Sequence, residues 1–132
     1  MALTTALICF SIMTLIFIST DIFFTYSTKG FFYGFSANRK AVELSPLASR
    51  IKRVVQNQTE SAAYIVPVLA AGALLGVTGS GVETAALLII LGRAAFAALY
   101  YTGISFVRVP AFMLASLSSL WIGYVLLTSL PA

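Results

Sequence analysis

The sequence predicts an all-α membrane protein, a single domain folded as a bundle of four transmembrane helices. Hydrophobic residues make up 60% of the 132 residues, charged residues only 9%, and the mean hydropathy is +0.99. Soluble domains carry roughly 25% charged residues. A chain of this length has room for about four spans of roughly 20 residues each. Apolar stretches place these spans approximately at residues 3–26, 57–76, 83–102 and 110–130.

The first span, from about Leu3 to Tyr26, has no basic residue before Lys29. It lacks the basic segment and the cleavage site of a secretory signal, so we expect it to be retained. Asp21, near its end, is expected to be an interfacial carboxylate exposed to water. Residues 27–56 form a polar loop that contains six of the eight basic residues. These are Lys29, Arg39, Lys40, Arg50, Lys52 and Arg53.

The basic loop sets the predicted topology. By the positive-inside rule the loop is cytoplasmic, so the N-terminus lies on the opposite side of the membrane. Four spans then place the C-terminus on that side as well. Without a recognisable organelle-targeting segment, the simplest expected location is a bacterial inner membrane, and the alternative is the endoplasmic reticulum. The net charge of +4 is explained by this topology and does not indicate a nucleic-acid partner.

The remaining elements are predicted from turn and capping residues. Ser45 and Pro46 mark the start of a helix, because proline suits the first helical turn. This helix is expected to run unbroken into the second span and to bend at Pro67. A glycine-rich turn follows, and Pro110 opens the fourth span. Small residues are expected to allow close helix contact. They are Gly72, Gly76, Ser116, Ser118, Ser119 and Gly123.

Two charged residues lie where a membrane protein tolerates charge least. Glu60 opens the second apolar stretch, and Arg93 interrupts the third. A charge at membrane depth is costly and normally faces a partner or a polar cavity. We therefore expect Glu60 and Arg93 to face each other as a structural ion pair, or to face a shared polar ligand.

Helical spacing extends this pair to a set of five side chains. Arg53, Asn57 and Glu60 are spaced i, i+4, i+7 and form one stripe on a helix. Arg93 and Tyr100 share a face of the third span. Such a set suits a zwitterionic ligand, because arginine forks hold carboxylates and a glutamate holds an ammonium. The absence of histidine excludes histidine metal sites and Ser-His-Asp triads.

These residues resemble the signature of the MAPEG family, the membrane-associated proteins in eicosanoid and glutathione metabolism. The likeness covers residues 45–130 best, and three motifs carry it. They are Arg53-x-x-x-Asn57-x-x-Glu60, Gly92-Arg93 followed by Tyr100, and the segment from Tyr100 through Arg108 to Pro110. The long basic first loop and the four-span layout are also similar.

The resemblance implies a homotrimer of four-helix protomers, with glutathione bound between neighbours near the cytoplasmic side. It implies a transferase or peroxidase that acts on lipophilic electrophiles. Arg93 would be the electrostatic anchor, and Tyr100 or Tyr101 would donate a hydrogen bond. The candidate glutathione-binding residues are Arg53, Asn57, Glu60, Arg93, Tyr100 and Arg108.

The sequence also departs from the family pattern. Members that use glutathione carry an arginine early in the fourth span, whereas Phe112 stands near that place here and cannot stabilise a thiolate. Arg108 could substitute from the connecting turn, and Gln56 stands where catalytic members commonly have arginine. The alternative is a non-catalytic lipid-binding member or an accessory subunit of a larger membrane complex. A small transporter is disfavoured, because no pair of broken helices marks a midplane site.

Overall fold

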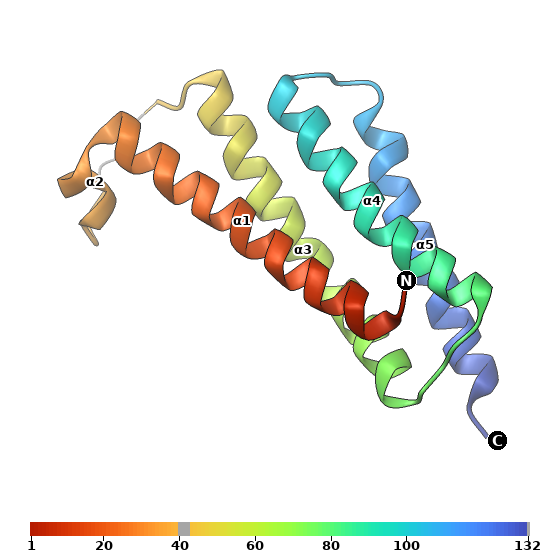
Figure 1. Cartoon of the computed structure of the whole chain (residues 1–132). Helices are drawn as coiled ribbons and strands as arrows, with labels where there is room; N and C mark the ends of the chain where they lie inside the picture. The colour runs from red at the N-terminus through yellow and green to blue at the C-terminus, as the bar shows by residue number, and fades with distance from the viewer. Residues whose placement is uncertain (40–42, 132) are drawn as a thin grey trace.

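The computed structural model describes residues 1–39 and 43–131, and Figure 1 shows that this part of the chain is helical. The helices are α1 (Leu3–Lys29), α2 (Phe31–Phe35), α3 (Pro46–Leu74), α4 (Ser80–Thr102) and α5 (Arg108–Ser129). Within these described residues no strand occurs, which confirms the predicted all-α class.

Three of the long helices, α1, α4 and α5, are long and apolar enough to cross a membrane. Helix α3 is as long, but its first half carries Arg50, Lys52, Arg53 and Glu60. The three apolar helices are consistent with an integral membrane protein. That α3 crosses the membrane as a fourth span stays a prediction.

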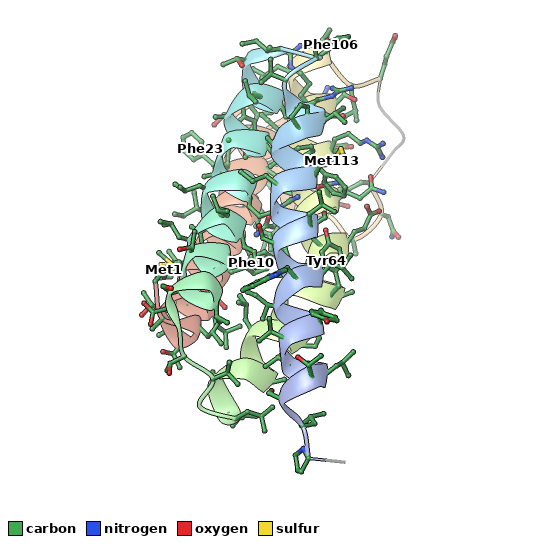
Figure 2. The ribbon with its side chains drawn as sticks, turned by 90° about the vertical axis from the view of Figure 1, so that its right-hand side faces the viewer. Met1, Phe10, Phe23, Tyr64, Phe106 and Met113 are labelled. Atoms are coloured by element: carbon green, nitrogen blue, oxygen red, sulfur yellow. The ribbon has the colours of Figure 1, made fainter. Side chains whose placement is uncertain are left out.

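The long helices enclose one main apolar core. Helix α1 packs on α3 and α4, and α5 packs on α4 and α3. Phe10, Ile65, Ile89 and Ile122 come from four different helices and are almost completely buried together. Figure 2 shows Phe10 within the bundle, whereas Phe23, Phe106 and Met113 lie on its outside. Large apolar side chains on the outer surface are what contact with lipid requires.

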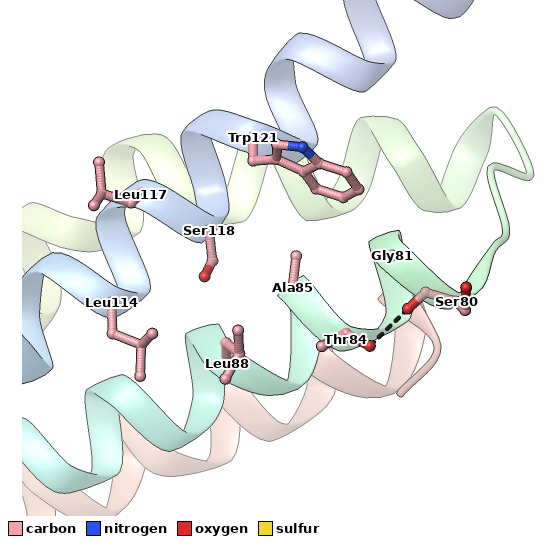
Figure 3. A pocket seen from close by; sticks show the side chains of 9 residues that line it. All are labelled: Ser80, Gly81, Thr84, Ala85, Leu88, Leu114, Leu117, Ser118 and Trp121. Carbon is pink, nitrogen blue, oxygen red and sulfur yellow. Dashed lines mark hydrogen bonds between the residues drawn. The ribbon is translucent and has the colours of Figure 1, made fainter.

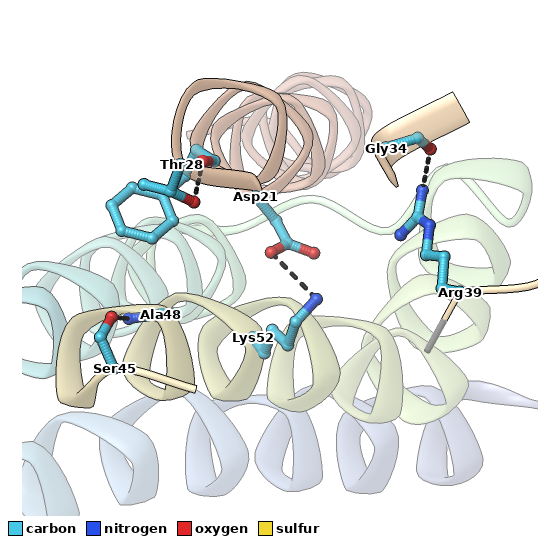
Figure 4. A network of polar contacts seen from close by, with 8 residues as sticks. Asp21, Thr28, Gly34, Arg39, Ser45, Ala48 and Lys52 are labelled. Atoms are coloured by element: carbon cyan, nitrogen blue, oxygen red, sulfur yellow. Dashed lines mark hydrogen bonds and ion pairs between the residues drawn. The ribbon is translucent and has the colours of Figure 1, made fainter. Parts of the chain in front are cut away.

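Helix α3 begins where the sequence predicted. The Oγ atom of Ser45 accepts a hydrogen bond from the backbone N–H of Ala48 at 3.2 Å, and Pro46 is the first helical residue (Figure 4). The serine oxygen thereby satisfies one of the unpaired donors of the first turn. The helix then continues through Pro67 to Leu74, so its expected unbroken course is confirmed.

The polar segment before Ser45, which we expected to be loop, is partly helical. Helix α1 extends to Lys29, and Gly30, with φ of 88°, separates it from the short helix α2. The left-handed backbone of Gly30 is readily adopted only by glycine. Gly34 lies against the ring of Tyr26. Lys40, part of the predicted basic loop, lies outside the described residues.

The carboxylate of Asp21, near the end of α1, is less exposed to water than we predicted. An oxygen of Asp21 lies 3.4 Å from the Nζ atom of Lys52 on α3, as Figure 4 shows. The aspartate side chain is only 23% exposed. Lys52 projects from α3 toward α1, so the two helices hold an ion pair between them.

Close contact between helices occurs at Gly72, as expected, where a Cβ atom would lie 2.5 Å from Cδ1 of Leu3 on α1. Another close contact is at a glycine that we did not select for this role. A Cβ atom on Gly92 of α4 would lie 2.9 Å from the backbone oxygen of Ala111 on α5. Gly76 instead adopts a φ of 64° in the turn after α3, and the nearest side chain to Gly123 is Val68 at 3.9 Å. The expectation of close packing at Gly76 and Gly123 is therefore corrected.

Candidate functional site

A polar pocket of about 110 Å³ opens between α3, α4 and α5. Its lining residues are Arg53, Gln56, Asn57, Glu60, Phe96, Tyr100 and Arg108. Five of these were candidates from the sequence, and the structure brings all five together. Gln56 and Phe96 are the additional lining residues, and Arg93 is the one candidate that does not line the pocket.

The α3 wall of the pocket is a chain of polar contacts along one helix face. Nη1 of Arg53 donates a hydrogen bond to Oε1 of Gln56 at 3.1 Å. Nε2 of Gln56 donates to Oε1 of Glu60 at 2.9 Å. Residues three and four positions apart meet on a helix, so these contacts are local. Gln56 thereby holds a guanidinium and a carboxylate in place, and both remain exposed for a ligand.

The opposite wall is formed by Tyr100 of α4 and Arg108 of α5. The guanidinium of Arg108 lies over the Tyr100 ring, 4.6 Å from its centroid. We expected Arg108 in the connecting turn and the fourth span to begin at Pro110. The structure corrects this, because α5 begins at Arg108. The last long helix therefore does start with an arginine, and its side chain lines the pocket.

Phe112 lies outside the polar pocket. Its ring packs against Phe96, with 6.0 Å between the centroids. It lines an apolar groove of about 940 Å³ between α3 and α5. Polar residues also line the groove, and the hydroxyl oxygens of Tyr64 on α3 and Ser116 on α5 lie 2.9 Å apart. Phe96 and Phe112 therefore stand where the polar pocket and the apolar groove meet.

The expected ion pair between Glu60 and Arg93 is absent. Arg93 is 0% exposed, and its Nη1 donates to Oδ1 of Asn57 at 2.7 Å. Its Nε donates to Oε1 of Gln58 at 3.0 Å. Glu60 is on the exposed, pocket-facing side of α3, where the carboxylate keeps its hydration. Two neutral amides of α3, Asn57 at the pocket wall and Gln58 in the buried stripe, therefore take the place of a charged partner.

Gln58 is the residue of this region that the sequence analysis missed. It is 0% exposed, and its Nε2 donates to Oγ1 of Thr14 on α1 at 2.9 Å. The helical spacing of the sequence could have indicated its burial, because Gln58 follows Val54 by four residues and precedes Ile65 by seven. All three lie on the buried stripe of α3. A glutamine in such a stripe indicates a buried polar partner.

Tyr101 does not contribute a second phenol to the pocket. Its ring packs edge-on against Phe17 of α1, with 6.2 Å between centroids. The hydroxyl group is buried and has no hydrogen-bond partner within residues 1–39 and 43–131. Consecutive residues on a helix point about 100° apart, so only one of the two tyrosines can face the pocket.

A second hollow, of about 500 Å³, lies between the other ends of α4 and α5 (Figure 3). Trp121 of α5 covers Gly81 of α4 there, and Ser118 contributes a polar atom. No charged side chain lines this hollow. It therefore offers packing surface for an apolar partner and none of the charges found in the polar pocket.

The fold and the pocket define a class, that of helical membrane proteins with a charged pocket beside an apolar groove. Within that class the identity follows from a family model, the MAPEG family, which matches residues 1–128. The chain therefore belongs to the MAPEG family. Neither the curated proteins nor the solved structures gave a significant match.

Proposed function

We propose that this protein is a glutathione-dependent membrane transferase or peroxidase acting on lipophilic electrophiles, with glutathione bound in the polar pocket. One observation carries the proposal. Two guanidinium groups, a carboxylate, two amides and a phenol line a single pocket. Glutathione carries two carboxylates and one ammonium, so Arg53 and the Asn57 amide complement the former and Glu60 the latter. Arg108 is then left for the sulfur.

The proposed chemistry uses the thiolate of glutathione as the nucleophile. The positive charge of Arg108 favours the thiolate over the thiol, and the Tyr100 phenol donates a hydrogen bond to the sulfur. The thiolate forms a carbon–sulfur bond with the electrophile, and the leaving group departs with the electron pair of the bond that breaks. Arg108 supplies the cation that the family has early in its last span.

The apolar groove supports a lipophilic acceptor. It is lined almost wholly by apolar side chains of α3 and α5. Phe112 of the groove contacts Phe96 of the polar pocket. An acceptor that enters from the bilayer along the groove would thus reach the side of the pocket where the thiolate forms.

The small size of the pocket supports assembly with further copies. Its volume of about 110 Å³ is below the roughly 300–1,000 Å³ of most ligand pockets. A neighbouring protomer would supply the missing wall, in agreement with the homotrimer that family membership suggests. We further propose that the protein has four spans, with α3 as the second. Its pocket faces the cytoplasm, both termini lie on the opposite side, and the proposed membrane is a bacterial inner membrane.

Calorimetric titration of the detergent-purified protein with glutathione tests the proposal. We expect saturable binding that Glu60→Gln and Arg108→Ala each weaken about tenfold or more, since hydrogen bonds to charged groups contribute roughly 1.5–3 kcal/mol. Glu83→Gln is the matched control, because Glu83 lies at the other end of α4 beside Met1. No binding by the folded wild-type protein, or equal loss in the control, would contradict the proposal.

A non-catalytic lipid-binding member, free or within a larger membrane complex, is the second candidate. The observation that favours it is the size of the apolar groove, about 940 Å³ against about 110 Å³ for the polar pocket. This alternative predicts co-purified lipid that glutathione does not displace, and no turnover of an aryl halide with glutathione. Conjugate formation that Arg108→Ala abolishes would exclude it.

A further inference from the structure

We infer that Arg93 is a positioning residue that acts through Asn57. It holds the amide of Asn57 so that the amide nitrogen faces the pocket as a donor to a ligand carboxylate. This inference rests on the proposed glutathione site and assigns a role within it. The observation behind it is a buried network in which one guanidinium fixes two amide side chains.

The orientation of Asn57 follows from hydrogen-bond chemistry. A guanidinium has donors only, so the atom of Asn57 that lies 2.7 Å from Nη1 of Arg93 must be the amide oxygen. The amide nitrogen, with two donor hydrogens, then points away from Arg93. Asn57 lines the pocket, and its nitrogen is left to serve the ligand. Without Arg93 the amide could turn over and present an oxygen, which would repel a carboxylate.

Arg93 itself is separated from the pocket. Its guanidinium lies over the ring of Phe96, 5.0 Å from the centroid, and Phe96 is a lining residue of the pocket whereas Arg93 is not. The arginine side chain is 0% exposed, and its Nη2 is buried without a partner among the described residues. A ligand in the pocket therefore meets Phe96 and Asn57, while Arg93 stands behind them.

Gln58 and Thr14 brace the arginine from the other side. Gln58 accepts from Nε of Arg93 at 3.0 Å, which turns the amide nitrogen of Gln58 toward Thr14 of α1. The hydrogen bonds thus run in one donor-to-acceptor direction, from Arg93 of α4 through Gln58 of α3 to Thr14 of α1. Gln58 is 0% exposed and cannot reach a ligand, so an effect of Gln58 on binding reports positioning alone.

The test is a double-mutant cycle on glutathione affinity, measured by calorimetry on the full-length protein in detergent. The variants are Asn57→Ala, Arg93→Lys, Gln58→Met, and each of the last two combined with Asn57→Ala. Lysine keeps the positive charge but cannot hold both amides at once. Gln58→Met removes the brace at similar volume. Thermal unfolding monitored by circular dichroism verifies that each variant is folded.

We expect Asn57→Ala to weaken glutathione binding about ten- to hundredfold. Arg93→Lys and Gln58→Met should each weaken it severalfold or more, and neither should have a further effect once Asn57 is alanine. Effects that add fully would show that Arg93 and Gln58 act independently of Asn57 and would overturn the inference alone. Wild-type protein that binds no glutathione would overturn the proposed function, and the positioning role with it.

If Arg93→Lys does not fold, the Gln58→Met pair decides the question by the same criterion. Ile122→Val is the matched control. It removes one buried methyl group from the main core on α5 and leaves both contacts of Arg93 in place. We expect its glutathione affinity to stay within about twofold of wild type. A loss as large as that of Gln58→Met would indicate a general loosening of the bundle and contradict the inference.

Discussion

At the scale of single residues, Arg108 is the side chain on which the proposed catalysis depends most. Its guanidinium lies over the Tyr100 ring in a pocket that also holds Arg53 and Glu60. A cation stacked on an aromatic ring is held in place by about 0.5–1 kcal/mol at an exposed site. That attraction is small enough for a ligand anion to draw the guanidinium toward itself.

We predict that Arg108→Ala lowers kcat for glutathione conjugation by about a hundredfold or more, because one electrostatic donor at a reacting centre contributes that much. Arg108→Lys should retain a larger share of the wild-type kcat than Arg108→Ala, since lysine keeps the positive charge. Steady-state kinetics with an aryl halide measure both. Arg39→Ala is the control, because Arg39 bonds the backbone oxygen of Gly34, away from the pocket. Full activity in Arg108→Ala would show that the thiolate is stabilised elsewhere.

A second residue-scale prediction concerns Phe112 at the junction of groove and pocket. Phe112→Ala removes the ring that packs on Phe96 and widens the junction. The KM for long-chain electrophiles should change severalfold, while the calorimetric affinity for glutathione stays the same. Leu127→Ala, which alters the groove near the end of α5, gives the comparison. A parallel loss of glutathione affinity in Phe112→Ala would argue that the ring supports the polar pocket.

The sequence predicted the candidate residues better than their contacts. Helical period placed Arg53, Asn57 and Glu60 on one face of α3, and they do line one pocket. The partner of Arg93 was mispredicted, because spacing along a helix says which residues share a face but not which groups of two helices meet. Charge alone suggested Glu60, whereas the partners of Arg93 are the uncharged amides of Asn57 and Gln58.

At the scale of helices, the packing of α4 on α5 depends on Gly92. We predict that Gly92→Ala destabilises the protein by about 1–3 kcal/mol, because the new methyl group meets backbone atoms of Ala111 and Ala115 that cannot move aside easily. Gly123→Ala is the matched control, with only Val68 at 3.9 Å. Thermal unfolding in detergent compares the two. Equal stability of both variants would show that α5 shifts to accommodate the methyl group.

The helix starts show why some boundaries were predictable. Ser45 and Pro46 begin α3 because a hydroxyl cap and a proline both favour a helix start. Helix α5 was placed two residues late, because Pro110 was assumed to be its first residue. The first-turn amides have no helical acceptor, so proline is tolerated at the third position as well. Arg108 therefore fits before it.

At the scale of the whole molecule, the open question is whether α3 crosses the membrane. Ser36 follows α2 and Thr78 lies in the turn after α3, so a spanning α3 would separate them. We predict that a cysteine at Ser36 reacts with a membrane-impermeant maleimide from the cytoplasmic side only. A cysteine at Thr78 should react from the opposite side only. The background is Cys9→Ser, which removes the native thiol.

Labelling of both positions from the same side would contradict the four-span topology.

The composition predicted the membrane class from the scarcity of charge, and family membership agrees with it. Helical periodicity does not predict whether the chain assembles with other copies, because apolar side chains that face lipid and those that face a neighbour have the same pattern.

The uncharged partners of Arg93 also bear on how the chain enters the bilayer. Asn57 and Gln58 precede Arg93 in the sequence, so both amides leave the ribosome before the arginine does. An arginine in an apolar segment disfavours insertion by the translocon by about 2.5–3.5 kcal/mol at the helix centre. We expect residues 80–102 to insert less efficiently alone than behind residues 46–79. Glycosylation-tag reporters on the two fragments would measure this, and equal efficiencies would show that the arginine needs no partner during biosynthesis.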